Sequence, residues 1–278
     1  MILWSLDARY FPLDLPLRVA IALAVLSLVG LWAWWKRQLT ASGLVMALAM
    51  GLATTLIGGF TSLSLYLFFL ISAALIGRLS RRIRGLERIH RKGGRRDWMQ
   101  VLANGGAALV AIVIHHFEPG PLPLAVFCAC LGEACSDTWA SEIGVLSSRD
   151  PVSILTFTRV PRGLSGGVSL LGTGAALLSS VLYAMFAFSC YRGIAFPLAL
   201  VVCLSSFVGV MVDSLMGATI QAHYYDEKDD LFTEHSHDRE GNALKLARGI
   251  RFMDNDMVNL TSNVVTFLLC WSLGSLMV

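Results

Sequence analysis

The feature that most constrains this chain is a repeated pattern of long apolar stretches. A helix needs about 20 apolar residues to cross the hydrocarbon core of a bilayer. Stretches of this kind occur at residues 15–35, 40–59, 61–77, 98–117, 122–147, 166–189, 195–222 and 254–277. The third is short, so a bundle of seven spans is the alternative to eight. The sequence predicts an all-α fold, a polytopic membrane helix bundle that forms a single integral membrane domain over residues 1–278.

The composition fits this class and argues against others. Apolar residues make up 55% of the chain and charged residues 15%, which is too few charges for the surface of a soluble domain of this length. The net charge is only +3, so a nucleic acid is not an expected partner. Membrane lipids are the expected surroundings.

The lysines and arginines predict the orientation, because loops on the cytoplasmic side are enriched in them. Two segments carry most of them, a basic loop at residues 78–97 and a charged loop at residues 223–253. Placing both in the cytoplasm leaves only Arg9, Arg18 and Arg192, of 22 basic residues, on the other side. The expected location is a prokaryotic inner (plasma) membrane, with both chain ends outside.

Polar and acidic residues interrupt the apolar stretches, chiefly in the halves expected to face the cytoplasm. An ionisable side chain in a membrane helix costs about 2.5–3.5 kcal/mol on insertion scales, so it is usually paired or functional. Asp137 and Ser141 are four residues apart and share a helix face with Glu142 nearby, while Asp213 lies in a later stretch. The simpler alternative is a buried polar pair that holds two helices together.

Three of the apolar stretches begin on the same predicted side with polar, glycine-rich or acidic segments, around residues 95–106, 165–173 and 254–263. The N–H groups at a helix start suit phosphate oxygens. Carboxylates suit Mg²⁺, which takes oxygen ligands and bridges to phosphates. We therefore expect a metal–polyphosphate site on the cytoplasmic face. Neither a Walker A loop nor a dinucleotide fingerprint is present in the sequence.

Five ordered motifs resemble an integral-membrane family of unknown function. They are RRD at 95–97 with NGG at 104–106, SDTWASEIG at 136–144, GGVS at 166–169 with GT at 172–173, GATIQ at 217–221, and DND at 254–256 with VN at 258–259. That family includes animal transmembrane protein nineteen and the plant and cyanobacterial phytyl-phosphate kinase. The resemblance covers about residue 30 to the C-terminus. It implies phosphorylation of an isoprenoid monophosphate to the diphosphate, with CTP as the donor.

The residues expected to carry this chemistry fall into three groups. The catalytic group is Asp137, Glu142, Asp213, Arg95 and Arg96. The Mg²⁺ ligands are expected among Asp137, Glu142, Asp213, Asp254 and Asp256. The groups that bind the prenyl-phosphate substrate or the nucleotide are Asn104, Thr138, Ser141, Arg159, Arg162, Gly166, Gly167, Ser169, Gln221 and Asn259. Asn263 continues the face of Asn259, and its replacement by Leu is expected to change nucleotide binding little.

The leading interpretation is thus a membrane-embedded prenyl-phosphate kinase whose substrate tail lies between helices. The alternative is a transporter or flippase for a phosphorylated or anionic solute, because carboxylates near a broken helix also suit proton or sodium coupling. A third is a scaffold subunit whose buried acids are structural. The one-sided placement of the polar residues favours the enzyme, because a transporter needs polar groups near the midplane and a wet route outward.

Overall fold

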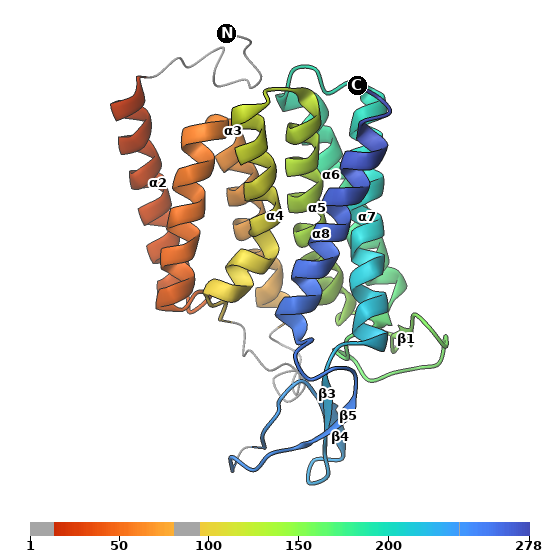
Figure 1. The fold of residues 1–278 in the computed structure, drawn as a ribbon. Helices are drawn as coiled ribbons and strands as arrows, with labels where there is room; N and C mark the ends of the chain where they lie inside the picture. Colours follow the sequence, from red (N-terminus) through yellow and green to blue (C-terminus); the bar gives the residue numbers. More distant parts are fainter. Residues whose placement is uncertain (1–13, 81–94, 239) are drawn as a thin grey trace.

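The computed structural model describes residues 14–80, 95–238 and 240–278. Within them the chain forms α2 (Leu15–Trp35), α3 (Ala41–Ser80), α4 (Trp98–Phe117), α5 (Pro121–Gly144), α6 (Leu170–Cys190), α7 (Phe196–Thr219) and α8 (Asn255–Gly274). These helices run roughly parallel to one another in a single bundle (Figure 1). Six of them are long and apolar enough to cross a membrane. The predicted polytopic helix bundle is confirmed.

Helix α3 contains two of the predicted spans. Gly59 interrupts it with φ 75° and ψ −173°, a conformation that is essentially restricted to glycine. The chain reverses its direction at this glycine. The two ends of α3 consequently lie at the same end of the bundle, where Gly43 packs against the backbone of Arg96 and Gly77 packs against the carboxylate of Glu142. The predicted stretches 40–59 and 61–77 are therefore the two halves of α3, and the short third span is real.

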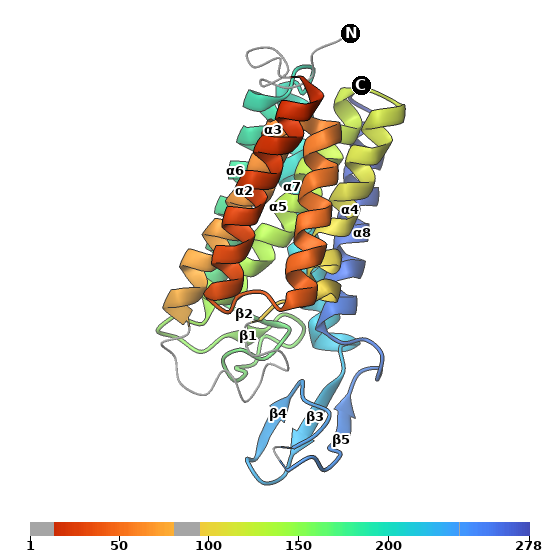
Figure 2. The same ribbon diagram turned by 90° about the vertical axis from the view of Figure 1, so that its left-hand side faces the viewer.

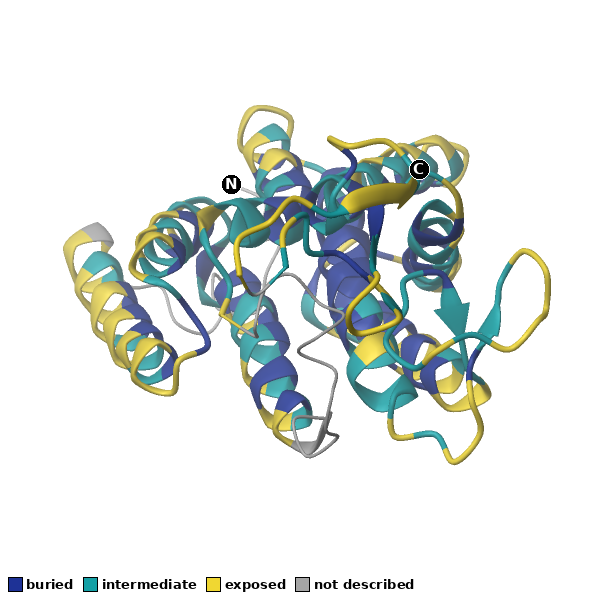
Figure 3. Ribbon diagram, turned by 90° about the horizontal axis from the view of Figure 1, so that it is seen from below, coloured by how far each residue is buried: buried dark blue, intermediate teal, exposed yellow. Residues whose placement is uncertain are grey.

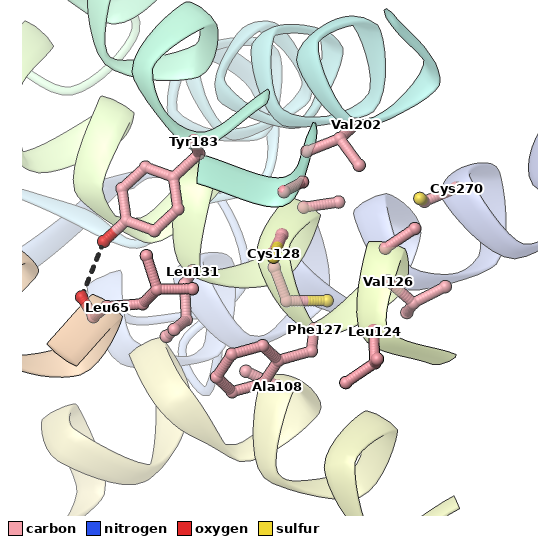
Figure 4. Packing of buried hydrophobic residues seen from close by; sticks show 14 of the residues in the cluster. Leu65, Ala108, Leu124, Val126, Phe127, Cys128, Leu131, Tyr183, Val202 and Cys270 are labelled. Carbon is pink, nitrogen blue, oxygen red and sulfur yellow. Dashed lines mark hydrogen bonds between the residues drawn. The ribbon is translucent and has the colours of Figure 1, made fainter. Parts of the chain in front are cut away.

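Helix α5 forms the centre of the bundle. Every residue from Leu124 to Leu131 is at most 1% exposed. Its neighbours α3, α4, α6, α7 and α8 surround it, and their outer faces are the exposed ones (Figure 3). Tyr183 of α6 crosses the core and donates a hydrogen bond from its hydroxyl to the carbonyl of Leu65 in α3, at 3.0 Å (Figure 4). The most buried helix is thus the one that carries the SDTWASEIG motif.

Several predicted helix ends are shorter in the structure. Helices α5 and α7 end at Gly144 and Thr219, and α6 begins at Leu170, four residues after the predicted start. The glycine-rich segment before α6 instead forms β2 (Gly167–Val168), which pairs antiparallel with β1 (Val152–Ser153). Gly166 has φ +85°, which is incompatible with the first turn of a right-handed helix.

The charged segment after α7 folds into a small sheet. Strand β3 (His223–Asp226) lies between β4 (Leu231–Thr233) and β5 (Lys245–Arg248), and both pairings are antiparallel. The sheet projects beyond the helices on the side where α8 begins (Figure 2). Arg248 ties it to the bundle, because its guanidinium donates to the carbonyl of Gly217 in α7 at 3.1 Å. The predicted charged loop at residues 223–253 therefore contains a folded sheet.

The turn between α2 and α3, the start of α4, the β1–β2 segment and the sheet all lie at one end of the bundle, here called the polar end (Figure 1). The C-terminus lies at the opposite end, as does the start of α2. The segments that the lysine and arginine pattern assigns to one side of the membrane therefore share one end of the molecule, as far as they are described. The middle of the predicted basic loop, residues 81–94, lies outside the described residues.

Candidate functional site

A cavity of about 630 Å³ opens at the polar end. It will be called the polar cavity. Its walls come from α3, α4, α5, α6, α7 and α8, together with the β1–β2 segment and the sheet. Most of the residues that the sequence singled out line it, namely Arg96, Asn104, Asp137, Thr138, Ser141, Glu142, Arg162, Gly166, Gly167, Ser169, Asp213, Asp254, Asp256 and Asn259. Segments that are separated by more than 100 residues in the chain thus meet around one space.

Three of the predicted site residues, one catalytic (Arg95) and two binding (Arg159 and Gln221), do not line the polar cavity. Arg95 and Arg159 are exposed on connecting segments. Gln221 is only 1% exposed, and its side-chain amide donates to Ser165 Oγ (3.0 Å) and to Glu234 Oε1 (2.9 Å). Both acceptors do line the cavity, so Gln221 supports the wall from behind.

Arg96 is held in place by its backbone. Its N–H donates to the carbonyl of Gln38 (2.8 Å), and its carbonyl accepts from the N–H of Thr40 (3.0 Å). A side chain at Gly43 would collide with that same carbonyl, so the glycine permits the close approach of α3. The guanidinium lies over the ring of Phe69, with Cζ 5.5 Å from the ring centroid. A positive charge is therefore fixed in the cavity wall.

A polar network joins α5, α7 and α8 at the inner end of the cavity. Ser262 Oγ lies 2.7 Å from Glu133 Oε1 and 3.4 Å from Asp213 Oδ2. Asn263 donates to Glu133 Oε2 (2.6 Å), and Asn259, with its amide nitrogen toward the acceptors, donates to Asp213 Oδ2 (3.1 Å). Because a serine hydroxyl has one proton to donate, Ser262 cannot satisfy both carboxylates at once. Glu133 is not among the site residues predicted from the sequence.

Three of the helices that begin at the polar end, α4, α6 and α8, have their starts capped by side chains. Asp97 accepts from the N–H of Gln100, Asp254 from that of Met257 and Ser169 from that of Gly172, at 3.0–3.1 Å. The carboxylates of Asp97 and Asp254 offset the positive end of the helix dipole at α4 and α8. Helix α6 has a neutral cap instead, so its start is the most favourable of the three for an anion.

The segment before α6 is pressed against α7. A side chain at Gly166 would lie 2.5 Å from Ala218, so only glycine fits. Arg162, on the same segment, donates to Asp150 Oδ1 (3.2 Å) and to the carbonyl of Ser148 (3.1 Å), which keeps it at the cavity edge. A basic side chain and a neutral helix start therefore face the same space.

A family described as "Integral membrane protein DUF92" matches residues 24–267 of the sequence. The chain belongs to this family. The match includes all five of the ordered motifs and every helix that lines the polar cavity.

Members of the DUF92 family with similar sequences come from plants and archaea. "Protein PGR" of Arabidopsis thaliana is 30% identical over 275 residues, covering 90% of this chain and 93% of its own. "Uncharacterized membrane protein MJ0933" of Methanocaldococcus jannaschii is 28% identical, with 79% and 88% covered. "Protein VTE6, chloroplastic" of Arabidopsis thaliana is 26% identical, with 80% and 61% covered. No solved structure matches the chain.

The donor set in this DUF92 member limits how a metal ion would be held. Among the described residues, no three histidines, cysteines or acids lie close enough together to bind a metal by themselves. Magnesium usually takes one or two protein carboxylates and completes its shell with water and phosphate oxygens. Asp137 of α5 and Asp213 of α7 both line the polar cavity, and these two helices pack against each other, so this pair fits such a partial set. The carboxylate of Asp254 caps α8 by accepting from the N–H of Met257. As far as the structure is described, the five predicted acids do not come together as one set of metal ligands.

Sequence reasoning missed several residues that line the polar cavity in this family member. They are Gln38, Gln100, Ser165, Glu234 and Arg251. Gln100 lies one turn before Asn104 on α4 and accepts from it, through its carbonyl, at 2.8 Å, so helical spacing could have indicated it. Arg251 lies three residues before the cap of α8. Gln38 and Glu234 carry no local signal, because only the fold brings their segments to the cavity.

Proposed function

We propose that this chain is a membrane-embedded kinase that transfers a phosphoryl group from a nucleoside triphosphate, CTP by resemblance, to an isoprenoid monophosphate. In this proposal the polar cavity faces the cytoplasm of a prokaryotic inner membrane. The observation that carries it is the polar cavity, in which arginines, carboxylates and the start of α6, capped by the neutral Ser169, lie together. The resemblance of the five motifs to phytyl-phosphate kinases supports the choice of substrate.

The acceptor needs little activation. A phosphate monoester is largely a dianion at neutral pH, so one of its oxygens can form the new bond to the γ-phosphorus while the bond from that phosphorus to the bridging oxygen breaks. Catalysis then depends on alignment and on charge stabilisation. In this proposal Arg96, Arg162 and Arg251, which line the polar cavity, would bind phosphate oxygens, and backbone N–H groups at the start of α6 would assist them.

The acids would act through a divalent cation. Asp137 and Asp213 would hold Mg²⁺ between α5 and α7, and Asn259 fixes the orientation of Asp213 through its hydrogen bond. The chemistry that Mg²⁺ would supply there is positive charge to offset the charge that develops on the phosphate oxygens. In its absence these carboxylates would repel a triphosphate, which is why the proposal needs the cation.

The direct test is phosphoryl transfer by purified protein, with labelled CTP or ATP, Mg²⁺ and a panel of prenyl monophosphates. We expect diphosphate product from the wild type and a loss of at least about 100-fold in Asp137→Asn, because Asn keeps the size but not the charge of Asp137. The matched control is Glu118→Gln, which removes an acid at the opposite end of the bundle. Full activity in Asp137→Asn, or a sharp fall in its melting temperature, would assign Asp137 a different role.

One observation favours the transport alternative. Glu133 is 2% exposed and lies one turn deeper than Asp137, bound by Ser262 and Asn263 inside the bundle. A carboxylate at that depth suits proton or sodium coupling. Saturable uptake of an anionic solute by liposomes that contain the protein, with no diphosphate formed, would favour this function over the kinase.

A further inference from the structure

A second cavity, of about 100 Å³, lies beside the polar one, between α2, the two halves of α3 and α4. It will be called the apolar cavity. Its walls are formed by aliphatic side chains, glycines and two aromatic rings, those of Tyr66 and Phe69. The hydroxyl of Tyr66 is already used, because it donates to the carbonyl of Gly105 at 2.8 Å. Away from its mouth, this cavity therefore offers a ligand hydrocarbon contacts only.

The mouth of the apolar cavity is also the wall of the polar cavity. Arg96, Gln100 and Asn104 line both. Phe69, over which the guanidinium of Arg96 lies, belongs to the apolar wall. A molecule that occupied both cavities would thus have a charged group next to Arg96 and a hydrocarbon part among α2, α3 and α4.

We propose that the apolar cavity holds the hydrocarbon chain of the isoprenoid monophosphate, with the phosphate beside Arg96 in the polar cavity. This inference rests on the proposed function and adds the path of the tail to it. The apolar cavity is a single space of about 100 Å³ that adjoins the polar one, which suits a lipid with a single chain better than a phospholipid with two. The tail then leaves the bundle along α2, which packs against α3 at its edge (Figure 2).

Such a cavity would position the substrate more than it would attract it. A prenyl chain in the bilayer is already in apolar surroundings, so moving it between helices gains little from the hydrophobic effect. The gain is in alignment, because a tail held between α2 and α3 fixes the distance of the phosphate from the nucleotide. Filling the cavity should therefore displace the bound substrate without removing any group that contacts phosphate.

The test uses a farnesyl monophosphate that carries a diazirine in its first isoprene unit. The protein is placed in phosphatidylcholine nanodiscs without nucleotide, irradiated and mapped by mass spectrometry. We expect adducts on the α2, α3 and α4 residues of the apolar cavity, and displacement by unlabelled farnesyl monophosphate. Ala47→Phe, which fills the cavity, should reduce these adducts at least tenfold. Ala49→Phe, on the exposed face of the same helix, is the matched control and should leave them unchanged.

Three results would overturn the inference: adducts confined to other helices, adducts that Ala47→Phe leaves unchanged, or equal displacement by lysophosphatidic acid, which would identify an acyl lipid as the occupant. Mapping on the wild type keeps the test valid if Ala47→Phe does not fold. Because no nucleotide is present, the outcome is independent of turnover. Adducts in the apolar cavity without phosphoryl transfer would count against the proposed kinase function but not against the tail-binding site. Phosphoryl transfer with adducts on other helices would count against the tail-binding site but not against the kinase function.

Discussion

Asn263 shows how a single side chain can connect two helices inside the bundle. It is fully buried, and its amide nitrogen donates to the carbonyl of Cys130 (2.8 Å) and to the carboxylate of Glu133 (2.6 Å). Both partners belong to α5, whereas Asn263 belongs to α8. Its position on the face of Asn259 suggested a minor role, but its contacts assign it to the packing of α8 against α5.

We therefore predict that Asn263→Leu destabilises the protein by about 1–3 kcal/mol, because it leaves a buried carboxylate oxygen and a carbonyl without their donor. The measurement is the melting temperature in detergent. Val264→Leu, one residue further along and exposed, is the control and should melt like the wild type. An Asn263→Leu protein of unchanged stability would show that water replaces the amide.

His223 gives the protein a dependence on pH outside the membrane helices. Burial, and after it the positive charge of Arg248, lower the pKa of His223 from its ordinary value of 6.5, although Glu234 acts in the opposite direction. The folded state therefore keeps this ring neutral where the unfolded chain would protonate it. The stability is fully present above about pH 6.5 and is lost as the pH falls through the lowered pKa of the folded state.

We predict a lower melting temperature at pH 5.5 than at pH 7.5, with a smaller difference in His223→Asn. The control is His116→Asn, which changes an exposed histidine at the other end of the bundle and should retain the wild-type difference. If His223→Asn shows the same fall as the wild type, another group is responsible for it.

At the scale of elements, the turn of α3 depends on one glycine. Gly59 has φ 75° and ψ −173°, a region that side chains rarely adopt. We predict that Gly59→Ala costs about 1–3 kcal/mol, because the backbone must hold a strained conformation to keep the two halves antiparallel. Thermal unfolding in detergent would measure it. Gly174→Ala is the matched control, since a methyl group there meets nothing within 4 Å and favours the helix.

The sequence predicted the elements well where their signal is local. The bounds of the first and fourth predicted spans coincide with those of α2 and α4, because apolar length, an acidic cap and the end of the apolar run all agree there. The prediction failed at Gly166 and Gly167, which look like a helix start: Gly166 has φ +85°, and Gly167 pairs with Ser153 of β1. The three-stranded sheet was missed because its strands are short and charged, so alternation gives no clear signal.

The polar cavity was predictable in the same uneven way. Acids and amides inside apolar stretches stand out, and Asp137, Asp213 and Asn259 all line it. Gln221 also stood out, yet it faces Ser165 and Glu234 behind the wall. The direction in which a side chain points just after the end of a helix depends on contacts between segments that are distant in the chain. The local sequence therefore does not specify it.

At the scale of the whole molecule, the common end of the polar segments makes the orientation testable. We predict that Phe157→Cys and Glu227→Cys, both exposed at the polar end, are protected from a membrane-impermeant thiol reagent in intact cells. Arg192→Cys, exposed at the opposite end, should be labelled. The reason is the excess of lysine and arginine at the polar end.

The background for that experiment is a variant without the six native cysteines, all of which are buried or partly buried. Labelling of Glu227→Cys from outside the cell would show that the orientation in the membrane is the reverse of the predicted one. It would also move the polar cavity away from the cytoplasmic nucleotide pool, which the kinase proposal requires.

The central place of α5 has a consequence for biogenesis. Among the described helices, α5 is the long one that falls outside the six apolar enough to span a membrane unaided. The insertion machinery recognises a helix by its apolarity, and Glu133 and Asp137 lower that of α5, so the retention of α5 in the bilayer should depend on its neighbours more than that of the other helices does. Three of those neighbours, α6, α7 and α8, are synthesised after it. The helix that carries the central acids is therefore expected to commit to the membrane late, once the end of the chain has emerged from the ribosome.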